Sequence, residues 1–381
     1  MLTSCSHRPS ANSSRRAWLR NCVQLAAGVV GVGLPPWLAL AQTPEVPASK
    51  EPATNVGRTA ERLATERTIS SLLTPPAREA IDRGLAYLAT QQNDDGSLGR
   101  GYYGRNPAVC GLCGMAFLAH GSTPGRGPHG MRLEKVTQFL LNATQASGFI
   151  EQRESASRGP MYDHGFATLL LCEVYGMSRV PSLREKLSEA VKLIVSTQND
   201  EGGWRYQPRR EDADISVTVC QVMALRAAHN AGIHVPATTL ERALGYVRRC
   251  QNPDGGFSYF ANQARDSAFP RSAAALVALH SGGVYQGVEI ERGLQYLLQF
   301  PPTTQNLGQA YYFYGHYYAI QVMWHAGGRI WNDWYTRIRD ILIAGQQPNG
   351  SWADLISPEY GTAMACLILQ MPSNYLPIFD R

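Results

Sequence analysis

The 381-residue sequence lacks the short motifs of several large enzyme classes. It has no His-Glu-x-x-His ligand pair, no phosphate loop and no Gly-x-Ser-x-Gly nucleophile turn. It also has no Asp-Asp-x-x-Asp cluster of the kind that holds magnesium against a diphosphate. No pattern therefore supports a metalloprotease, a nucleotide hydrolase or a serine hydrolase, and metal-dependent ionisation of a diphosphate is not expected.

Charge is scarce, at 17% of residues, and acidic residues are missing altogether from positions 1–41, which hold four arginines. The remainder carries 31 basic and 30 acidic side chains, so it is nearly neutral. Such a chain lacks the excess of positive charge that binding to nucleic acid requires, and we expect no nucleic-acid partner.

A long hydrophobic run is also missing, because the apolar stretch at 23–34 is too short for a convincing membrane span. It follows the twin-arginine pattern at 14–20 and precedes Ala-Leu-Ala at 39–41. We therefore predict that residues 1–41 are a twin-arginine signal peptide that directs the protein to the periplasm or cell envelope. Retention of this segment as an anchor is the alternative. Residues 42–77, rich in Pro, Thr and Ala, are predicted to be a linker.

A repeat organises the rest of the chain. A Gln followed four residues later by Gly and six later by a large apolar residue occurs at Gln92, Gln198, Gln251 and Gln346. The gap between the middle two is 53 residues, and Gln145 stands where a missing copy is expected. In the fifth copy Pro301 and Pro302 replace the turn. A fixed period of this length indicates a repeat architecture.

Two kinds of helix alternate along these repeats. Amphipathic helices that end in the glutamine turn are expected at 77–92, 133–145, 183–198, 239–251, 290–299 and 335–346. Nearly uncharged helices that follow each turn are expected at 108–120, 165–177, 215–231, 271–282, 311–327 and 360–371. A helix that is apolar on every side is buried on every side. We therefore predict an all-α fold over residues 78–381, an α/α toroid (an (α/α)₆ barrel) whose inner helices line a central cavity.

The cysteines indicate neither a metal centre nor a clear disulfide framework. Six follow the predicted signal peptide, and most fall in apolar helical stretches, so mostly buried thiols are expected. An even number in an exported protein leaves disulfides open. Cys110 and Cys113 lack a second pair of ligands. We expect neither a metal nor an organic cofactor.

The repeat resembles the glutamine-tryptophan motif of squalene cyclases. The residues that match its basic, small, aromatic, aliphatic, glutamine and glycine positions are Arg83, Gly84, Tyr87, Leu88, Gln92 and Gly96. Residues 242–257 match again, with Phe257 in place of the final Trp. The chain is thereby identified as a member of the prenyltransferase and squalene oxidase repeat superfamily. This resemblance implies the toroid and an isoprenoid or other lipid-like small-molecule partner, but it does not assign a reaction.

An acidic segment at the start of the third uncharged helix carries the sharpest chemical hypothesis. Glu-Asp-Ala-Asp-Ile-Ser at 211–216 resembles the Asp-x-Asp-Asp-Thr motif with which squalene–hopene cyclases protonate an alkene. Because an alkene is a very weak base, the donor must be a carboxylic acid kept protonated by burial and by a like-charged neighbour. The resemblance implies Asp214 as the acid and Asp212 as its neighbour. The alternative is that one of them caps a helix that starts at Ile215.

His164 is a second candidate, at the start of the second uncharged helix. Prenyltransferase β subunits carry a similar His-Gly pair that meets a diphosphate, so the resemblance implies that His164 binds a diphosphate or polarises Asp214. In the alternative, Asp163 caps the helix and His164 is an interior histidine. The zinc site of that family does not carry over, because its Asp, Cys and His positions have no counterparts here.

Aromatic side chains crowd the start of the fifth uncharged helix. The candidate cavity residues are Tyr311, Tyr312, Tyr314, His316, Tyr317 and Trp324. Aromatic faces stabilise cations, which is how squalene cyclases guide carbocations. We expect these residues to line the substrate cavity, and packing in the core is the alternative.

Two functions remain open on this basis. One is an exported isoprenoid-binding protein that acts as a proton-initiated terpene cyclase. The other is a non-catalytic exported binding or scaffold protein that uses the ring cavity or its rim. A glycosidase is a weaker third option, since it needs two carboxylates about 5–10 Å apart across the cavity. One ring argues against a cyclase, because squalene cyclases enclose their cavity between two. Peripheral contact with a membrane is left open.

Overall fold

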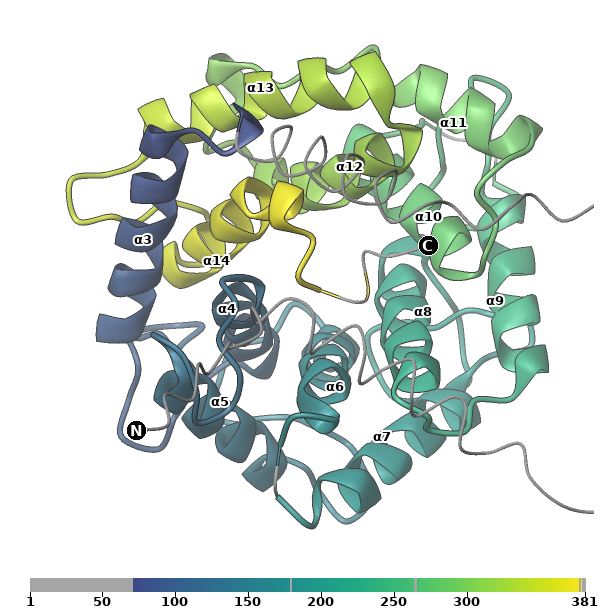
Figure 1. Cartoon of the computed structure of the whole chain (residues 1–381). Helices are drawn as coiled ribbons and strands as arrows, with labels where there is room; N and C mark the ends of the chain where they lie inside the picture. Colours follow the sequence, from purple (N-terminus) through teal and green to yellow (C-terminus); the bar gives the residue numbers. More distant parts are fainter. Residues whose placement is uncertain (1–70, 179, 264–265, 377, 379–381) are drawn as a thin grey trace, which may run out of the picture. The chain divides into compact units, whose positions relative to one another are not determined.

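The computed structural model describes residues 71–378 except 179, 264, 265 and 377. The predicted signal peptide and most of the predicted linker lie outside these residues. Within them, helices alternate between an outer and an inner layer (Figure 1). The outer helices are α3 (Pro75–Thr90), α5 (Gly130–Asn142), α7 (Leu183–Thr197), α9 (Ala237–Arg249), α11 (Val288–Leu297) and α13 (Gly328–Gly345). The inner helices are α4 (Pro107–Ala119), α6 (Pro160–Tyr175), α8 (Ile215–Asn230), α10 (Phe269–Ser281), α12 (Tyr312–Ala326) and α14 (Pro358–Leu369).

Each inner helix packs against the next, and α14 returns to α4, which closes the ring. Every residue of α4 is buried, whereas α9 buries one stripe and leaves its arginines in solvent. Burial on all sides is what an uncharged helix requires, and one buried stripe is what an amphipathic helix requires. The predicted α/α toroid is therefore confirmed.

The repeat glutamines join neighbouring outer helices. Gln198 Nε2 donates to the carbonyl of Gly202 in its own turn and to the carbonyl of Thr239 in α9, both at 2.8 Å. In the same way Gln346 Nε2 donates to Gly350 at 2.9 Å and to Ala80 of α3 at 2.8 Å. The last repeat is thus joined to the first by the same contact that joins α7 to α9. Each glutamine satisfies two backbone carbonyls that would otherwise lack a donor.

The glycine of each turn allows a close approach to the next outer helix. Gly202 has a φ of 97°, and a Cβ atom there would lie 2.3 Å from the carbonyl oxygen of Arg242. Only glycine combines this backbone conformation with this contact. The basic residue of the motif completes the junction, because Arg242 Nη2 donates to the carbonyl of Asn199 at 2.6 Å.

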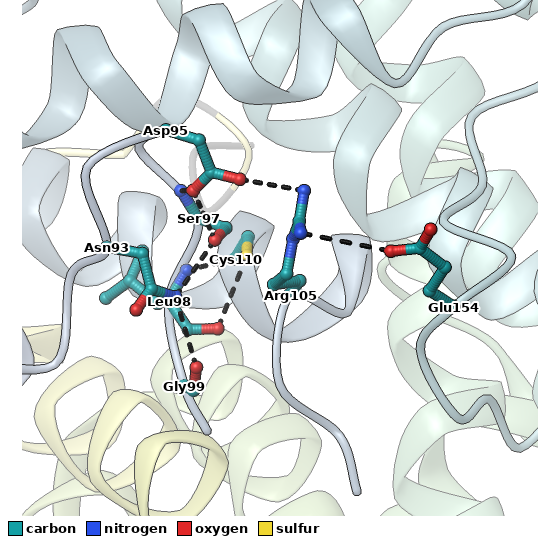
Figure 2. A network of polar contacts seen from close by, with 8 residues as sticks. All are labelled: Asn93, Asp95, Ser97, Leu98, Gly99, Arg105, Cys110 and Glu154. Atoms are coloured by element: carbon teal, nitrogen blue, oxygen red, sulfur yellow. Dashed lines mark hydrogen bonds and ion pairs between the residues drawn. The ribbon is translucent and has the colours of Figure 1, made fainter. Parts of the chain in front are cut away.

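The first turn has a polar network of its own, which Figure 2 shows. Asp95 Oδ1 accepts hydrogen bonds from the backbone N–H and the hydroxyl of Ser97, at 3.0 and 2.6 Å. Asp95 also forms an ion pair with Arg105 at 2.9 Å. The backbone N–H of Leu98 donates to Cys110 Sγ at 3.2 Å, which ties the turn to α4.

Three boundaries differ from those expected by five residues or more. Helix α13 begins at Gly328 rather than at 335, because Gly327, with a φ of 68°, reverses the chain within one residue of α12. The ring also begins before residue 78, since Leu72 and Leu73 are buried and Arg339 Nη1 donates to the Leu72 carbonyl at 3.0 Å. Helix α6 begins at Pro160 rather than at 165, because proline is favoured in the first helical turn.

The fifth copy departs from the pattern as expected. Helix α11 has only ten residues, and Gln299 Nε2 donates to the carbonyl of Gln295 in its own repeat at 3.5 Å. The six described cysteines are free, buried thiols, as predicted. No helix within the described residues is long and apolar enough to span a bilayer.

Candidate functional site

The inner helices begin at one end of the ring, which we call the mouth. Asn106, which caps α4, donates to Asp163 in the first turn of α6 at 2.8 Å. The ring of Tyr162 in α6 lies 6.3 Å from that of Tyr206, on the segment that precedes α8. The glutamine turns lead into this end, so the mouth collects the segments that precede all six inner helices (Figure 1).

Asp214 is the N-cap of α8 and is fully buried. Its Oδ1 accepts a hydrogen bond from the backbone N–H of Val217 at 2.9 Å. Its own N–H donates to the carbonyl of Trp204 at 3.0 Å, which fixes the cap against the preceding turn. Oδ2 is buried and accepts no hydrogen bond of ordinary geometry within the described residues. One oxygen therefore caps the helix, and the other is available for chemistry.

Burial raises the pKa of Asp214 to about 6, although four neighbours, the backbone N–H of Ser216 among them, act in the opposite direction. The N–H of Val217, the hydroxyl of Tyr259 and the charge of Arg205 each stabilise the carboxylate and lower its pKa. Desolvation outweighs them because it penalises only the charged form. Asp214 thus carries a proton in roughly half of the molecules at about pH 6.

Tyrosines that the sequence analysis did not select surround Asp214. The Tyr259 carbonyl accepts from the N–H of Ile215 at 3.0 Å, and the Tyr259 hydroxyl is hydrogen-bonded to that of Tyr206. The Tyr206 ring lies 6.3 Å from that of Tyr162. Tyr206 and Tyr259 are 53 residues apart, which is the repeat period. The two tyrosines therefore occupy equivalent positions in consecutive repeats, and an alignment of the repeats could have identified them as candidate site residues.

Asp212 does not provide the expected like-charged neighbour. Its side chain is 60% exposed and forms an ion pair with Arg205 at the surface of the mouth. The Arg205 guanidinium in turn lies over the rings of Tyr206 and Phe260, at 5.2 and 5.1 Å. Two residues of separation place Asp212 outside the helix cap, so burial rather than charge repulsion raises the pKa of Asp214.

His164 is an interior histidine whose two ring nitrogens both face backbone groups. Nδ1 accepts from the N–H of Ile150 at 3.2 Å, and Nε2 lies 3.1 Å from the carbonyl of Ala190. Burial lowers its pKa to about 4, so the ring is neutral. Neither nitrogen is left to polarise Asp214 or to meet a diphosphate. The cap of α6 is Gly159 rather than Asp163.

The aromatic residues of α12 divide between the ring axis and the outer layer. Tyr314 lies beside Ser216 of α8, and Tyr317 lies near Glu173 of α6, so both face across the ring. His316 instead packs against Phe269 and Trp334, at 5.1 and 6.0 Å. Tyr314 and Tyr317 thus lie toward the other inner helices and His316 lies toward the outer layer, and the lining of a substrate cavity stays a prediction for all of them.

The other three candidates of this run also differ in their positions. Tyr312 packs against His316 at 4.5 Å, and Trp324 packs against Trp331 of α13 at 5.0 Å, so both belong to the core between the layers. Tyr311 lies at the rim with 61% of its surface exposed. Within the part of the chain that the structure describes, no group of three His, Cys, Asp or Glu side chains is placed to hold a metal ion.

Residues 167–313 match the model of the squalene–hopene cyclase C-terminal domain. The matched segment contains Asp214 and Tyr259. Two curated relatives are drimenyl diphosphate synthases, from Streptantibioticus cattleyicolor and Streptomyces showdoensis. They are 28% identical over 191 and 189 residues, which is 49% of this chain and 34% and 33% of theirs. The match thus spans about a third of the length of these relatives.

Solved structures share the fold across nearly their whole length. The type II terpene cyclase MstE from Scytonema, in complex with merosterolic acid A, has a TM-score of 0.57 at 15% identity, covering 80% of this chain and 99% of that one. Cellobiose 2-epimerase from Bacillus thermoamylovorans has a TM-score of 0.58 at 12% identity, covering 77% and 98%. These likenesses show the fold alone.

The Scytonema comparison corrects the expectation drawn from size. Because 99% of that cyclase is covered by this chain, a single ring of these dimensions suffices for a type II terpene cyclase. The carbohydrate enzyme with the same fold shows that the ring does not by itself select a substrate. The glutamine-turn repeat, the cyclase domain matched at residues 167–313 and the closed toroid together support a place for the chain in the squalene–hopene cyclase-like superfamily.

Proposed function

We propose that this protein is a proton-initiated isoprenoid cyclase in which Asp214 is the acid. The observation that carries the proposal is the state of its carboxyl group. Asp214 is fully buried at the mouth, Oδ1 is held by the helix, and Oδ2 is left without a hydrogen bond of ordinary geometry among the described residues. A buried, neutral carboxylic acid with one oxygen outside the helix cap is what protonation of an alkene requires.

The expected reaction begins when the Oδ2–H proton adds to a terminal alkene carbon of the ligand. A C–H bond forms, the alkene π pair is consumed, and a tertiary carbocation and the Asp214 carboxylate result. The N–H of Val217 and the hydroxyl of Tyr259 stabilise that carboxylate. Faces of Tyr162 and Tyr314 stabilise the cation as rings close. The final cation loses a proton to water and becomes an alkene, and the Asp214 carboxylate takes up a new proton from solvent.

Asp163 is the other buried carboxyl group with a strongly raised pKa near the mouth. Burial raises its pKa to about 7, against hydrogen bonds from Ser157 and Asn106. Because Asn106 Nδ2 also donates to the carbonyl of Ala156 at 3.0 Å, Asp163 is part of a bridge between α4 and α6. We assign it a structural role and Asp214 the chemical one.

The second candidate is a non-catalytic binding or scaffold protein that uses the same ring. It is favoured by the surface position of Asp212 and by the backbone contacts of His164, because neither residue is then placed to tune the pKa of Asp214 as expected.

Export by the twin-arginine pathway is proposed from residues 1–41 alone. Cell fractionation of a chain carrying Arg15→Lys and Arg16→Lys tests it, because loss of the pattern should retain the protein inside the cell.

Product analysis by mass spectrometry separates the two candidates. The full chain is incubated with linear polyprenols, their diphosphates, squalene and an envelope lipid extract, beside Asp214→Asn and the control Asp212→Asn. The cyclase proposal expects a cyclised product from the parent and from Asp212→Asn, and at least a hundredfold less from Asp214→Asn. If the parent converts none of these compounds, the cyclase proposal is wrong and the non-catalytic binding or scaffold protein is the function that remains.

A further inference from the structure

A pocket lies at the end of the ring opposite the mouth, between the inner helices α8, α10 and α12, which are neighbours in the inner layer (Figure 1). It holds about 280 Å³ of space between protein atoms, part of it open to solvent, so it suits a group of a few atoms rather than a prenyl chain. Its arginine, Arg226, comes twelve residues after Asp214, the cap of α8, which is about 18 Å along the helix axis. The pocket is therefore separate from the candidate site.

The polar lining of this pocket is rich in hydrogen-bond donors. Among the described residues that line it, none is Asp or Glu, and the polar ones are Arg226, His280, Ser281, Tyr285, Gln321 and His325. Gln321 is already engaged, because its Nε2 donates to the carbonyl of Tyr317 at 2.9 Å. The guanidinium, imidazole and hydroxyl groups of the others can all donate hydrogen bonds. A lining that carries positive charge and no carboxylate favours an anion over a cation.

Arg226 carries a charge that no described residue neutralises. It is half-buried, and within the described residues its guanidinium forms no ion pair within 4 Å and no hydrogen bond. Arg271, the other arginine of the inner helices, donates instead to the carbonyl of Phe257 at 2.8 Å. The helix dipole favours cations in a last turn, which accounts for His280 and His325, but Arg226 precedes the last turn of α8. A half-buried cation without an acceptor is the group that a bound anion would neutralise.

Three aromatic rings form one side of the pocket and hold one another in place. The rings of His280 and Tyr285 are stacked, with their centroids 5.4 Å apart and their planes at 18°. The ring of His325 meets both of them edge-on, at 4.8 and 5.3 Å. These contacts join α10, the segment that follows it and α12, so the polar side chains are ordered before any ligand binds. Such preorganisation lowers the entropic cost of binding.

We propose that this pocket binds a small oxyanion, a carboxylate or a phosphate group, with Arg226 as its charged partner and His280 and His325 beside it. A guanidinium binds either group through paired N–H donors. The bound anion would join α8, α10 and α12 at the end of the ring that the glutamine turns do not reach, and so stabilise the ring. The inference goes beyond the proposed cyclase function and does not depend on it.

The test titrates the full chain with inorganic phosphate and with succinate, by calorimetry and by thermal unfolding at constant ionic strength. We expect at least one of them to bind at a single site with a dissociation constant of about 1 mM or lower, and to raise the melting temperature. Arg226→Gln should weaken binding about tenfold or more. Arg226→Lys should weaken it less, because lysine keeps the charge and loses the paired N–H groups. The control Arg337→Gln removes an exposed arginine of α13 and should leave the affinity unchanged.

Each outcome decides the inference without reference to catalysis. Binding of one probe alone supports it and identifies the anion as a phosphate or a carboxylate, and binding of both supports it for either group. If the parent binds neither probe, the inference is wrong. Equal weakening by Arg226→Gln and Arg337→Gln also overturns it, because affinity then follows net charge rather than the pocket. An affinity that Arg226→Gln leaves unchanged places the anion elsewhere and overturns it as well.

Discussion

At the scale of single residues, Asp214 caps α8 through Oδ1 alone, so its role as a helix cap is compatible with the acid role that we propose for it. Its position and its cap were predictable, because the Asp-x-Asp spacing and the start of an apolar helix coincide. The directions of Asp212 and His164 were not predictable. Asp212 pairs with Arg205, and His164 pairs with backbone groups of Ile150 and Ala190, and such contacts depend on the folded chain.

The pKa of Asp214 predicts how activity depends on pH. Because the acid must carry its proton, and burial raises its pKa to about 6, turnover should fall about tenfold per pH unit above that value. A rate profile from pH 5 to 8 checks this. A profile that stays level through pH 8 would show that Asp214 is not the proton donor.

The buried Asp163 predicts a pH dependence of stability. Its folded pKa of about 7 lies above its usual value of 3.8, so the folded state favours the neutral form. The stability it contributes is complete below about pH 4 and is lost as pH rises to about 7, by at most about 4 kcal/mol. Urea unfolding at pH 4.5, 6 and 8 should show this loss in the parent and a smaller one in Asp163→Asn. Parallel curves for the two proteins would contradict it.

At the scale of elements, the glutamine turn determines the fold. Its Gln, Gly and Arg positions are visible in the sequence, and in the folded chain each makes a contact to a neighbouring repeat. The helices were therefore predicted within a few residues. The start of α13 was missed, because Gly327 and Gly328 resemble a loop although the chain turns there in a single residue.

Gly202→Ala should be far more costly than an ordinary glycine substitution. Its Cβ would meet the Arg242 carbonyl oxygen at 2.3 Å, in addition to the strain of a φ of 97°. We expect a loss of about 3 kcal/mol or more of unfolding free energy. The control Gly232→Ala has a φ of 76° but nothing within 4 Å, so it should lose only about 1 kcal/mol. Equal losses in denaturant unfolding would refute the role assigned to the turn.

At the scale of the whole molecule, the ring depends on closure between its last and first repeats. Gln346 reaches Ala80, and Arg83 Nη2 donates to the Gln347 carbonyl at 2.9 Å. Closure was implied by the even repetition of the motif. The orientation of the aromatic residues in α12 was not, because the sequence does not show that Tyr314 and Tyr317 lie toward the other inner helices while His316 and Trp324 lie toward the outer layer.

Gln346→Ala should therefore weaken the whole ring. It removes two hydrogen bonds from partly buried carbonyls, which we expect to cost about 2 kcal/mol. Gln299→Ala is the matched control, since that exposed glutamine contacts only its own repeat. Thermal unfolding should show a lower melting temperature for Gln346→Ala and an unchanged melting temperature for Gln299→Ala. A loss of the same size in both would argue against closure as the source of stability.

The central claim is that Asp214 starts the reaction by giving a solvent-exchangeable proton to carbon. Running the reaction in D2O tests it most directly, because the proton on the buried carboxyl group is then replaced by deuterium before transfer. We predict that each cyclised product gains one carbon-bound deuterium, and that Asp214→Asn forms no such product. A cyclised product without deuterium, or one that Asp214→Asn makes as well as the parent, would contradict the account.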